Sequence, residues 1–303
     1  MRILSIGETL WDIFPDQELL GGAALNFSAN AARLGNSVAL ITAVGDDDRG
    51  RRACDAMRSL GLTTDLVSVA KREATGVAHV STTAEGEASF EIPRPAAFDT
   101  VAITPEVIRK IMPLKPDWMY FGTLLQIEPH IEQGIEALRI AMPEVCCFYD
   151  MNLRRGHWNL PLVQRLSRMA TVLKLNESEA KILDELSRTK PGTFSLASFC
   201  EGWATQYAIE TICITLGSAG CCVYEKGSFY TAPGYPAAVQ DSVGAGDAFA
   251  AAFLHGYHHR WPIVQTARFA NALGSVVASR AGATPQWTMR ECLEIASAAP
   301  TTS

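Results

Sequence analysis

Residues 241–249, Asp-Ser-Val-Gly-Ala-Gly-Asp-Ala-Phe, carry more information than any other stretch of this chain. Gly244 and Gly246 allow a tight turn that leaves backbone N–H groups uncovered. The apolar run 248–254 predicts a buried helix directly after the turn. Bare amides at a helix N-terminus favour anions, phosphate above all. A carboxylate such as Asp247 repels phosphate and is unexpected beside such amides. The pattern is explained if Asp247 takes a proton from a hydroxyl while the amides hold a transferred group.

Other glycine-rich motifs fit this stretch less well. No Gly-Lys-Ser/Thr step occurs in the chain, which excludes a Walker P-loop. A dinucleotide fingerprint needs Gly or Ala where Phe249 stands, and it belongs to the first βα unit of a domain. The remaining alternative is an ordinary glycine turn with an acid in the first helical turn.

Apolar runs and helical stretches alternate along the chain, which predicts a doubly wound, mainly parallel sheet flanked by helices. In such α/β sheets ligands bind beyond the carboxyl ends of the strands. The runs that predict strands are apolar on both faces: 3–6, 38–43, 118–121, 145–149, 172–175, 211–215 and 221–224. The stretches that predict helices are 23–34, 49–60, 105–112, 130–141, 160–169, 177–187, 246–258, 262–280 and 288–297.

One segment breaks this alternation. Residues 75–82 and 88–92 flank Ala-Glu-Gly-Glu at 84–87, which predicts an antiparallel hairpin. Residues 10–14 predict a short strand that leaves the main sheet. A small β flap over the ligand end of the sheet explains both segments, and the alternative is a decorative hairpin.

Composition and charge argue against several classes of protein. The 303 residues are 48% hydrophobic and 19% charged, and the net charge is −6, which argues against a nucleic-acid partner. The eight cysteines form no C-x-x-C pair and indicate reduced core thiols. The first residues read as a strand rather than a signal peptide, and no apolar run reaches the ~18 residues that span a bilayer. We therefore expect a cytoplasmic protein with no membrane partner.

Three histidines, His255, His258 and His259, gather at the end of the helix predicted over 246–258. A metal site is one interpretation. The other is a set of cations at a helix C-terminus, where the helix dipole favours them.

A second constellation, residues 21–35, begins with paired glycines and continues through Asn26 into a helix. Together with residues 241–247 it resembles the two signatures of the PfkB carbohydrate kinases, the ribokinase-like family. The resemblance covers essentially the whole chain, and further matches are spread along it: Asp12, Thr75-Gly76, Asp150-Met151-Asn152-Leu153-Arg154 with Trp158, Asn176-Glu177-Ser178-Glu179, and Thr215-Leu216-Gly217. Residues 150–158 and 94–99 look most like fructokinases.

The resemblance implies a single ribokinase-like domain over 1–303, with a lid formed by segments 9–20 and 70–98. It implies transfer of the γ-phosphoryl group of ATP to a primary sugar hydroxyl, with D-fructose giving fructose 6-phosphate. Kinases for ribose, a nucleoside or a keto-deoxy sugar acid remain alternatives. An acidic substrate would need a basic side chain in its binding site, and Arg94 is a candidate. A catalytically silent sugar- or nucleotide-binding regulator is a second alternative.

The same resemblance assigns roles to individual residues. Asp247 is the base, Gly244, Ala245 and Gly246 form the anion hole with it, and Arg154 adds a charge on the phosphate or sugar side. The resemblance assigns the sugar contacts to Asp12, Gly21, Gly22 and Asn26. Three of these residues also have a second interpretation. Arg154 would form a surface salt bridge, Asp12 would be a turn acid, and Asn26 would cap the helix.

Nucleotide contacts fall to the second half of the chain. Asn176 and Glu179 match the element that orders Mg²⁺ and phosphates through water, although the pair also fits a capped helix start. Thr215 and Gly217 match a loop beside the phosphates, and Asn271 matches an adenine-edge position or is an exposed helix residue. A monovalent cation such as K⁺ would take the Asp241 carboxylate and carbonyls near Val243, Val277, Arg280 and Gly282. The lid would also pair two subunits into a homodimer.

Overall fold

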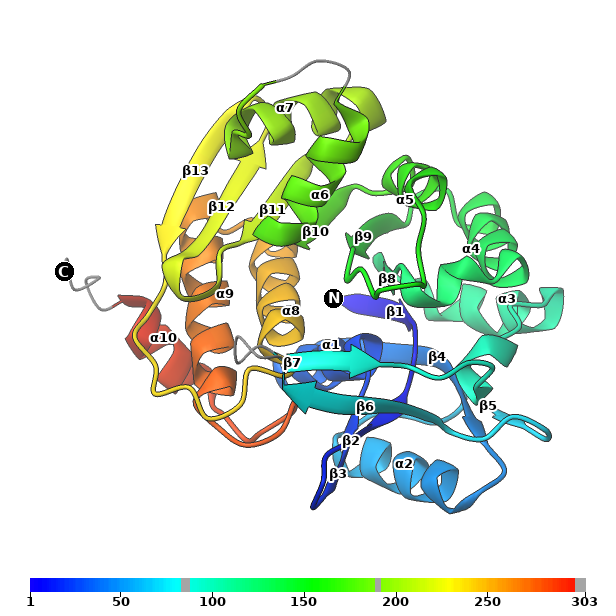
Figure 1. Cartoon of the computed structure of the whole chain (residues 1–303). Coiled ribbons are helices and arrows are strands. Elements are labelled where there is room, and N and C mark those ends of the chain that lie inside the picture. The colour runs from blue at the N-terminus through cyan, green and yellow to red at the C-terminus, as the bar shows by residue number, and fades with distance from the viewer. Residues whose placement is uncertain (83–87, 189–191, 298–303) are drawn as a thin grey trace. The chain divides into compact units, whose positions relative to one another are not determined.

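The computed structural model describes residues 1–82, 88–188 and 192–297. It consists of two compact units, Met1–Val145 and Cys146–Ser303. In each unit parallel strands alternate with helices, and the first unit carries a second, small sheet (Figure 1). The α/β class, with a mainly parallel sheet and a small separate sheet, is therefore confirmed.

The strands of the main sheet in the first unit follow the order β8-β1-β4-β5 and are all parallel. Phe27 of α1 stacks on Tyr120 of β8 with ring centroids 3.7 Å apart, and both rings are fully buried. These strands are β1 (Arg2–Ile6), β4 (Ser37–Gly45), β5 (Val67–Ala70) and β8 (Trp118–Gly122). The helices of this unit are α1 (Ala23–Arg33), α2 (Asp48–Ser59), α3 (Pro105–Ile111) and α4 (Pro129–Ala141), with single turns η1 (Ala97–Thr100), η2 (Met112–Leu114) and η3 (Leu124–Ile127).

The small sheet has the strand order β3-β2-β6-β7. Its members are β2 (Leu10–Ile13), β3 (Glu18–Gly21), β6 (Gly76–Thr82) and β7 (Ala88–Glu91). β6 and β7 pair antiparallel, which confirms the predicted hairpin, whereas β2 runs parallel to β6. The predicted turn at 84–87 lies outside the described residues.

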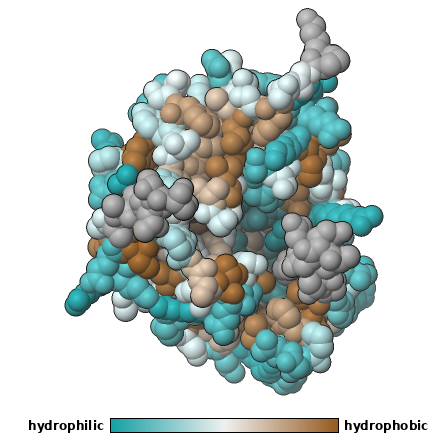
Figure 2. All heavy atoms as spheres, turned by 60° about the vertical axis from the view of Figure 1, so that its left-hand side comes forward, coloured by the Kyte–Doolittle hydropathy of each residue, from teal (hydrophilic) through white to brown (hydrophobic). Residues whose placement is uncertain are grey.

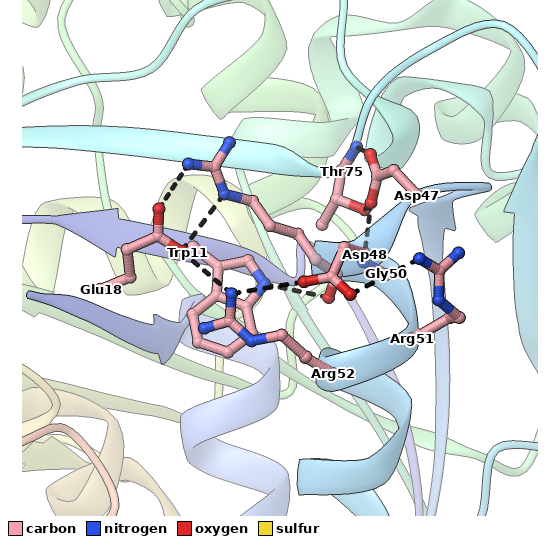
Figure 3. A network of polar contacts seen from close by, with 9 residues as sticks. Trp11, Glu18, Asp47, Asp48, Gly50, Arg51, Arg52 and Thr75 are labelled. Atoms are coloured by element: carbon pink, nitrogen blue, oxygen red, sulfur yellow. Dashed lines mark hydrogen bonds and ion pairs between the residues drawn. The ribbon is translucent and has the colours of Figure 1, made fainter.

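Asp47 joins helix α2 to the start of the small sheet (Figure 3). Its side chain caps α2 by accepting a hydrogen bond from Gly50 N at 2.7 Å. It also accepts from the backbone N–H of Thr75 at 2.8 Å and from the Thr75 hydroxyl at 2.6 Å. Burial alone would raise the pKa of Asp47, but these hydrogen bonds outweigh it and lower the pKa.

A second set of contacts in Figure 3 ties the same helix to strands β2 and β3. Arg49 and Arg52 of α2 both pair with Glu18 of β3. Arg52 also lies over the ring of Trp11 in β2, 4.3 Å from its centroid. The small sheet is thus anchored to α2 at two points.

Asp47→Ala removes the acceptor of three hydrogen bonds and is expected to destabilise the protein by about 1–2 kcal/mol. Thermal and urea denaturation at pH 7 measure the change. Because the pKa of Asp47 is lowered in the folded protein, its stabilisation is present at neutral pH and lost as the pH falls below about 4.

Asp48→Ala is the matched control, since the Asp48 side chain is 72% exposed and makes only exposed ion pairs with Arg51 and Arg52. We expect this variant to stay within about 0.5 kcal/mol of wild type. Equal stability of the two variants would mean that Asp47 does not hold the small sheet.

The second unit contains three parallel strands followed by two antiparallel ones, in the order β13-β12-β11-β10-β9. Figure 1 shows α8 and α9 on one side of these strands and α6 and α7 on the other. The strands are β9 (Cys146–Asp150), β10 (Val172–Asn176), β11 (Thr211–Thr215), β12 (Gly220–Glu225) and β13 (Ser228–Pro233). The helices are α5 (Leu160–Ser167), α6 (Glu177–Ser187), α7 (Leu196–Tyr207), α8 (Ala245–His258), α9 (Ile263–Ala278) and α10 (Met289–Ser297).

Among the described residues no helix is long and apolar enough to cross a bilayer. On the face drawn in Figure 2, hydrophobic residues form groups separated by hydrophilic ones. All eight cysteines are free, and six of them are buried.

Candidate active site

The glycine turn of residues 241–249 ends as predicted at a helix start. Gly244 is the N-cap of α8 with φ +80°, and a Cβ on it would lie 2.4 Å from Ala283 O. Only glycine fits such a position. Ala245 N donates to Ser242 O at 3.3 Å, so this amide serves the turn. Asp247 follows in the first turn of α8 and is only 9% exposed.

Lys174 of β10 lies against this helix start, and no motif pointed to it. Its Nζ is 2.9 Å from Asp150 Oδ1, and both side chains are buried. A Cβ on Gly246 would lie 3.3 Å from the same Nζ. The ammonium therefore sits beside the backbone that was predicted to hold a phosphoryl group.

The charges around Lys174 keep it protonated. Burial alone would lower the pKa of Lys174, but the nearby carboxylates of Asp150, Asp247 and Glu179 outweigh burial and raise the pKa. A cation beside a helix N-terminus is otherwise unfavourable, so these carboxylates explain why it is stable there.

Asn176 and Glu179 form a capping box at the start of α6, as one of the two interpretations predicted. Asn176 Oδ1 accepts from Glu179 N, and Glu179 Oε2 accepts from Asn176 N, both at 2.8 Å. Glu179 Oε1 also accepts from Leu153 N at 2.7 Å, which fixes the loop after β9. Burial raises the pKa of Glu179, although these hydrogen bonds and Lys174 oppose the shift.

Thr215 and Gly217 follow the neighbouring strand. Thr215 at the end of β11 is in register with Asn176 at the end of β10, so the two predicted nucleotide contacts lie side by side. Gly217 has φ +59°, which favours glycine, and begins a single helical turn. Arg154 is half-buried in the loop after β9.

Asn271 is not the exposed helix residue that one interpretation predicted. It is 8% exposed, and its Nδ2 donates to Ala232 O at 3.1 Å and to Pro233 O at 3.0 Å. Both amide hydrogens thus join α9 to the end of β13. If Asn271 contacts adenine, it does so through its side-chain oxygen, because its Nδ2 is already engaged.

Asp241 closes the loop before α8. Its Oδ1 accepts from Val243 N at 2.9 Å and its Oδ2 from Gly282 N at 3.1 Å. Val277 O accepts from Arg280 N at 3.1 Å. Val243 and Gly282 thus meet the Asp241 carboxylate through N–H groups, which do not bind cations, and the monovalent-cation site stays a prediction.

The predicted sugar contacts lie in the first unit. Asp12 is buried within strand β2, so the alternative of a turn acid was wrong. A Cβ on Gly21 would lie 2.4 Å from Asp12 Oδ2, and one on Gly22, at φ +112°, would lie 2.4 Å from Glu8 O. The two glycines are therefore required by the close approach of Asp12 and of the chain after β1.

Asn26 is buried within α1 and does not cap it. Gly22 is the N-cap, and Glu8 Oε1 accepts from Ala23 N at 2.8 Å in place of a local cap. The helix-cap alternative for Asn26 was therefore wrong. Glu8 was not singled out from the sequence, although an acid directly after a buried strand is the signal that could have found it.

Arg94 is held inside the first unit. Its guanidinium pairs with Asp99 at 2.5 Å and with Glu128 at 3.1 Å, and it donates to Leu124 O at 3.0 Å. The Arg94 side chain is 11% exposed. Two carboxylates already neutralise this cation, so it is poorly suited to bind an acidic substrate.

The histidine cluster does not form a metal site. No group of three or more His, Cys, Asp or Glu that could hold a metal occurs among the described residues. The rings of His255 and His259 lie 4.5 Å apart, and burial, with help from His259, lowers the pKa of His255 to about 4. Burial and the neighbouring histidines therefore favour a neutral His255 ring, packed near the end of α8.

The family model of the pfkB family carbohydrate kinases matches residues 14–289. Fructokinase-1 of Oryza sativa subsp. japonica is 26% identical over 308 residues, which cover 93% of each chain.

Two solved structures share the fold of the chain. A fructokinase from Xylella fastidiosa with bound ATP superposes with a TM-score of 0.83 at 24% identity, and covers 97% of both chains. A 2-dehydro-3-deoxygluconokinase from Thermotoga maritima superposes with a TM-score of 0.86 at 20% identity, and covers 98% of this chain and all of its own. With the family model matched over most of its length, this chain belongs to the PfkB family of carbohydrate kinases and is a sugar phosphotransferase.

Proposed function

We propose that this kinase transfers the γ-phosphoryl group of ATP to a primary hydroxyl of a neutral sugar, with D-fructose as the preferred substrate and fructose 6-phosphate as the product. The observation that carries the proposal is the buried carboxylate of Asp247 in the first turn of α8, beside the glycine turn and the charge of Lys174. The fructokinase matched over 93% of the chain supports the choice of sugar.

In this mechanism Asp247 takes the proton of the attacking hydroxyl. A carboxylate is a weak base, but in a loose transition state the hydroxyl becomes acidic late, as the new bond forms. The amides of Gly246 and Asp247 and the Lys174 ammonium neutralise the charge on the moving group. Arg154, in the loop after β9, adds a further positive charge.

The residues at the start of α6 fit a hydrated Mg²⁺ better than a directly bound one. Asn176 Oδ1 and both Glu179 oxygens already accept backbone hydrogen bonds, so a second hydrogen bond from a water bound to Mg²⁺ is the contact that remains. When bound, Mg²⁺ neutralises charge on the phosphates of ATP. Thr215 and Gly217 contact the same phosphates in this proposal.

The sugar is held by Asp12, Asn26 and the backbone of Gly21 and Gly22. The small sheet acts as a lid that excludes water and so limits ATP hydrolysis. The Thermotoga maritima neighbour makes a keto-deoxy sugar acid the second candidate substrate. The ion pairs of Arg94 with Asp99 and Glu128 favour a neutral sugar over an acid.

A panel of substrates with Mg·ATP, followed by ADP release, tests this proposal. The panel contains D-fructose, D-ribose, adenosine and 2-dehydro-3-deoxygluconate, each at matched concentrations. We expect turnover with fructose to exceed turnover with the others by at least about tenfold in kcat/KM.

Faster turnover of the sugar acid would overturn the neutral-sugar assignment. If none of the compounds is phosphorylated and fructose still raises the melting temperature, the chain is a sugar-binding regulator instead. The variant Asp247→Asn, measured in parallel, separates enzyme turnover from contaminating kinase activity.

A further inference from the structure

Gln126 is a buried amide that has no hydrogen-bond partner within the described part of the chain. It is 1% exposed, and neither its Oε1 nor its Nε2 has a hydrogen-bond partner among the described residues. Burial of an amide without a partner is costly, so such groups in folded proteins usually serve a bound water or a ligand.

Gln126 lies just beyond the carboxyl end of a strand, which is where α/β sheets bind ligands. It belongs to η3, directly after strand β8, and β8 runs parallel to β1 with Phe121 opposite Ile6. The chain after β1, which carries Glu8 and leads into β2, therefore leaves the same edge beside the chain that carries Gln126.

A second contact ties η3 to the small sheet. Arg94, which follows strand β7, donates to Leu124 O at 3.0 Å, two residues before Gln126. Gln126 is thus on a segment that adjoins both the carboxyl end of β1 and the base of the proposed lid. These are the elements to which the sugar contacts of this unit belong.

We propose that Gln126 is a specificity-determining residue that hydrogen-bonds hydroxyls of the sugar. This inference rests on the proposed function, since it takes the substrate to be a polyol. The amide offers two donors and one acceptor without charge, which matches a neutral sugar. A sugar that lacks the matching hydroxyl leaves the amide unpaired and is discriminated against.

Gln126→Leu and the volume-matched Gln126→Met test the proposal. Each removes the unpaired amide, so we expect the sugar-free protein to melt at a higher temperature than wild type. We also expect the KM for fructose to rise by about 5- to 100-fold while the KM for ATP stays unchanged. The rise in melting temperature that fructose causes should shrink in the same variants.

Gln133→Leu is the matched control, because Gln133 lies on the exposed face of α4 and the substitution is the same. A Gln126 variant with wild-type KM for fructose and a wild-type thermal shift would show that the amide serves an internal water. The thermal shift does not depend on turnover. If wild-type protein phosphorylates no sugar but fructose stabilises it through Gln126, the proposed function fails while the role of Gln126 stands.

Discussion

Replacing Asp247 with asparagine is expected to lower kcat by about 10²–10⁴ while ATP binds as before. The amide has nearly the same shape as the carboxylate, so it leaves the glycine turn and α8 in place. It cannot accept the proton of the sugar hydroxyl. Steady-state kinetics with fructose give kcat, and titration calorimetry gives the affinity for ATP.

The control for Asp247→Asn is Asp55→Asn, which makes the same change at a side chain that is 78% exposed on α2. This variant should keep wild-type kinetics. An Asp247→Asn enzyme with near-native turnover would remove the residue from its role as base. Loss of ATP affinity together with turnover would instead indicate that Asp247 shapes the nucleotide site.

The second large effect is expected from Lys174→Met. The substitution leaves the fully buried Asp150 carboxylate without the ammonium 2.9 Å away. Removing one partner of a buried ion pair typically costs about 3–5 kcal/mol, which urea denaturation measures directly. Turnover should fall as well, because the positive charge beside Gly246 is lost.

The double variant Lys174→Met/Asp150→Leu separates these two effects. Replacing a buried pair with apolar residues is often neutral for folding, so most of the lost stability should return. Turnover should remain low, since no cation then lies beside the glycine turn. A double variant with full activity would show that Lys174 serves the fold alone, and a stable single variant would contradict the ion pair itself.

The regular elements could be predicted because local pattern decides them. The helix predicted over 177–187 matches α6, and Gly35 and Gly61 take φ of +82° and +80° after the helices that they end. Helix α7 and strands β3, β5 and β13 were missed. The sequence of α7 mixes Gly, Cys and Trp without a clear apolar stripe, and β13 is largely exposed and ends at Pro233.

Contacts between distant segments decide the rest of the candidate site. The run 172–175 was read as apolar on both faces, although the lysine at its centre was the signal for a buried ion pair. The hydrogen bonds of Asn271 depend on where β13 ends, which the sequence of α9 does not contain. The unpaired state of Gln126 is likewise visible only once its surroundings are folded.

The carboxylate of Glu179 has one more consequence. By accepting from both Asn176 N and Leu153 N, it holds the loop after β9 and the start of α6 as one rigid piece before any nucleotide arrives. In the proposed mechanism, where ATP and Mg²⁺ meet this element, little conformational entropy is lost on binding, because folding has already restricted these residues. Under that proposal, nucleotide affinity at the start of α6 depends on preorganisation rather than on induced fit.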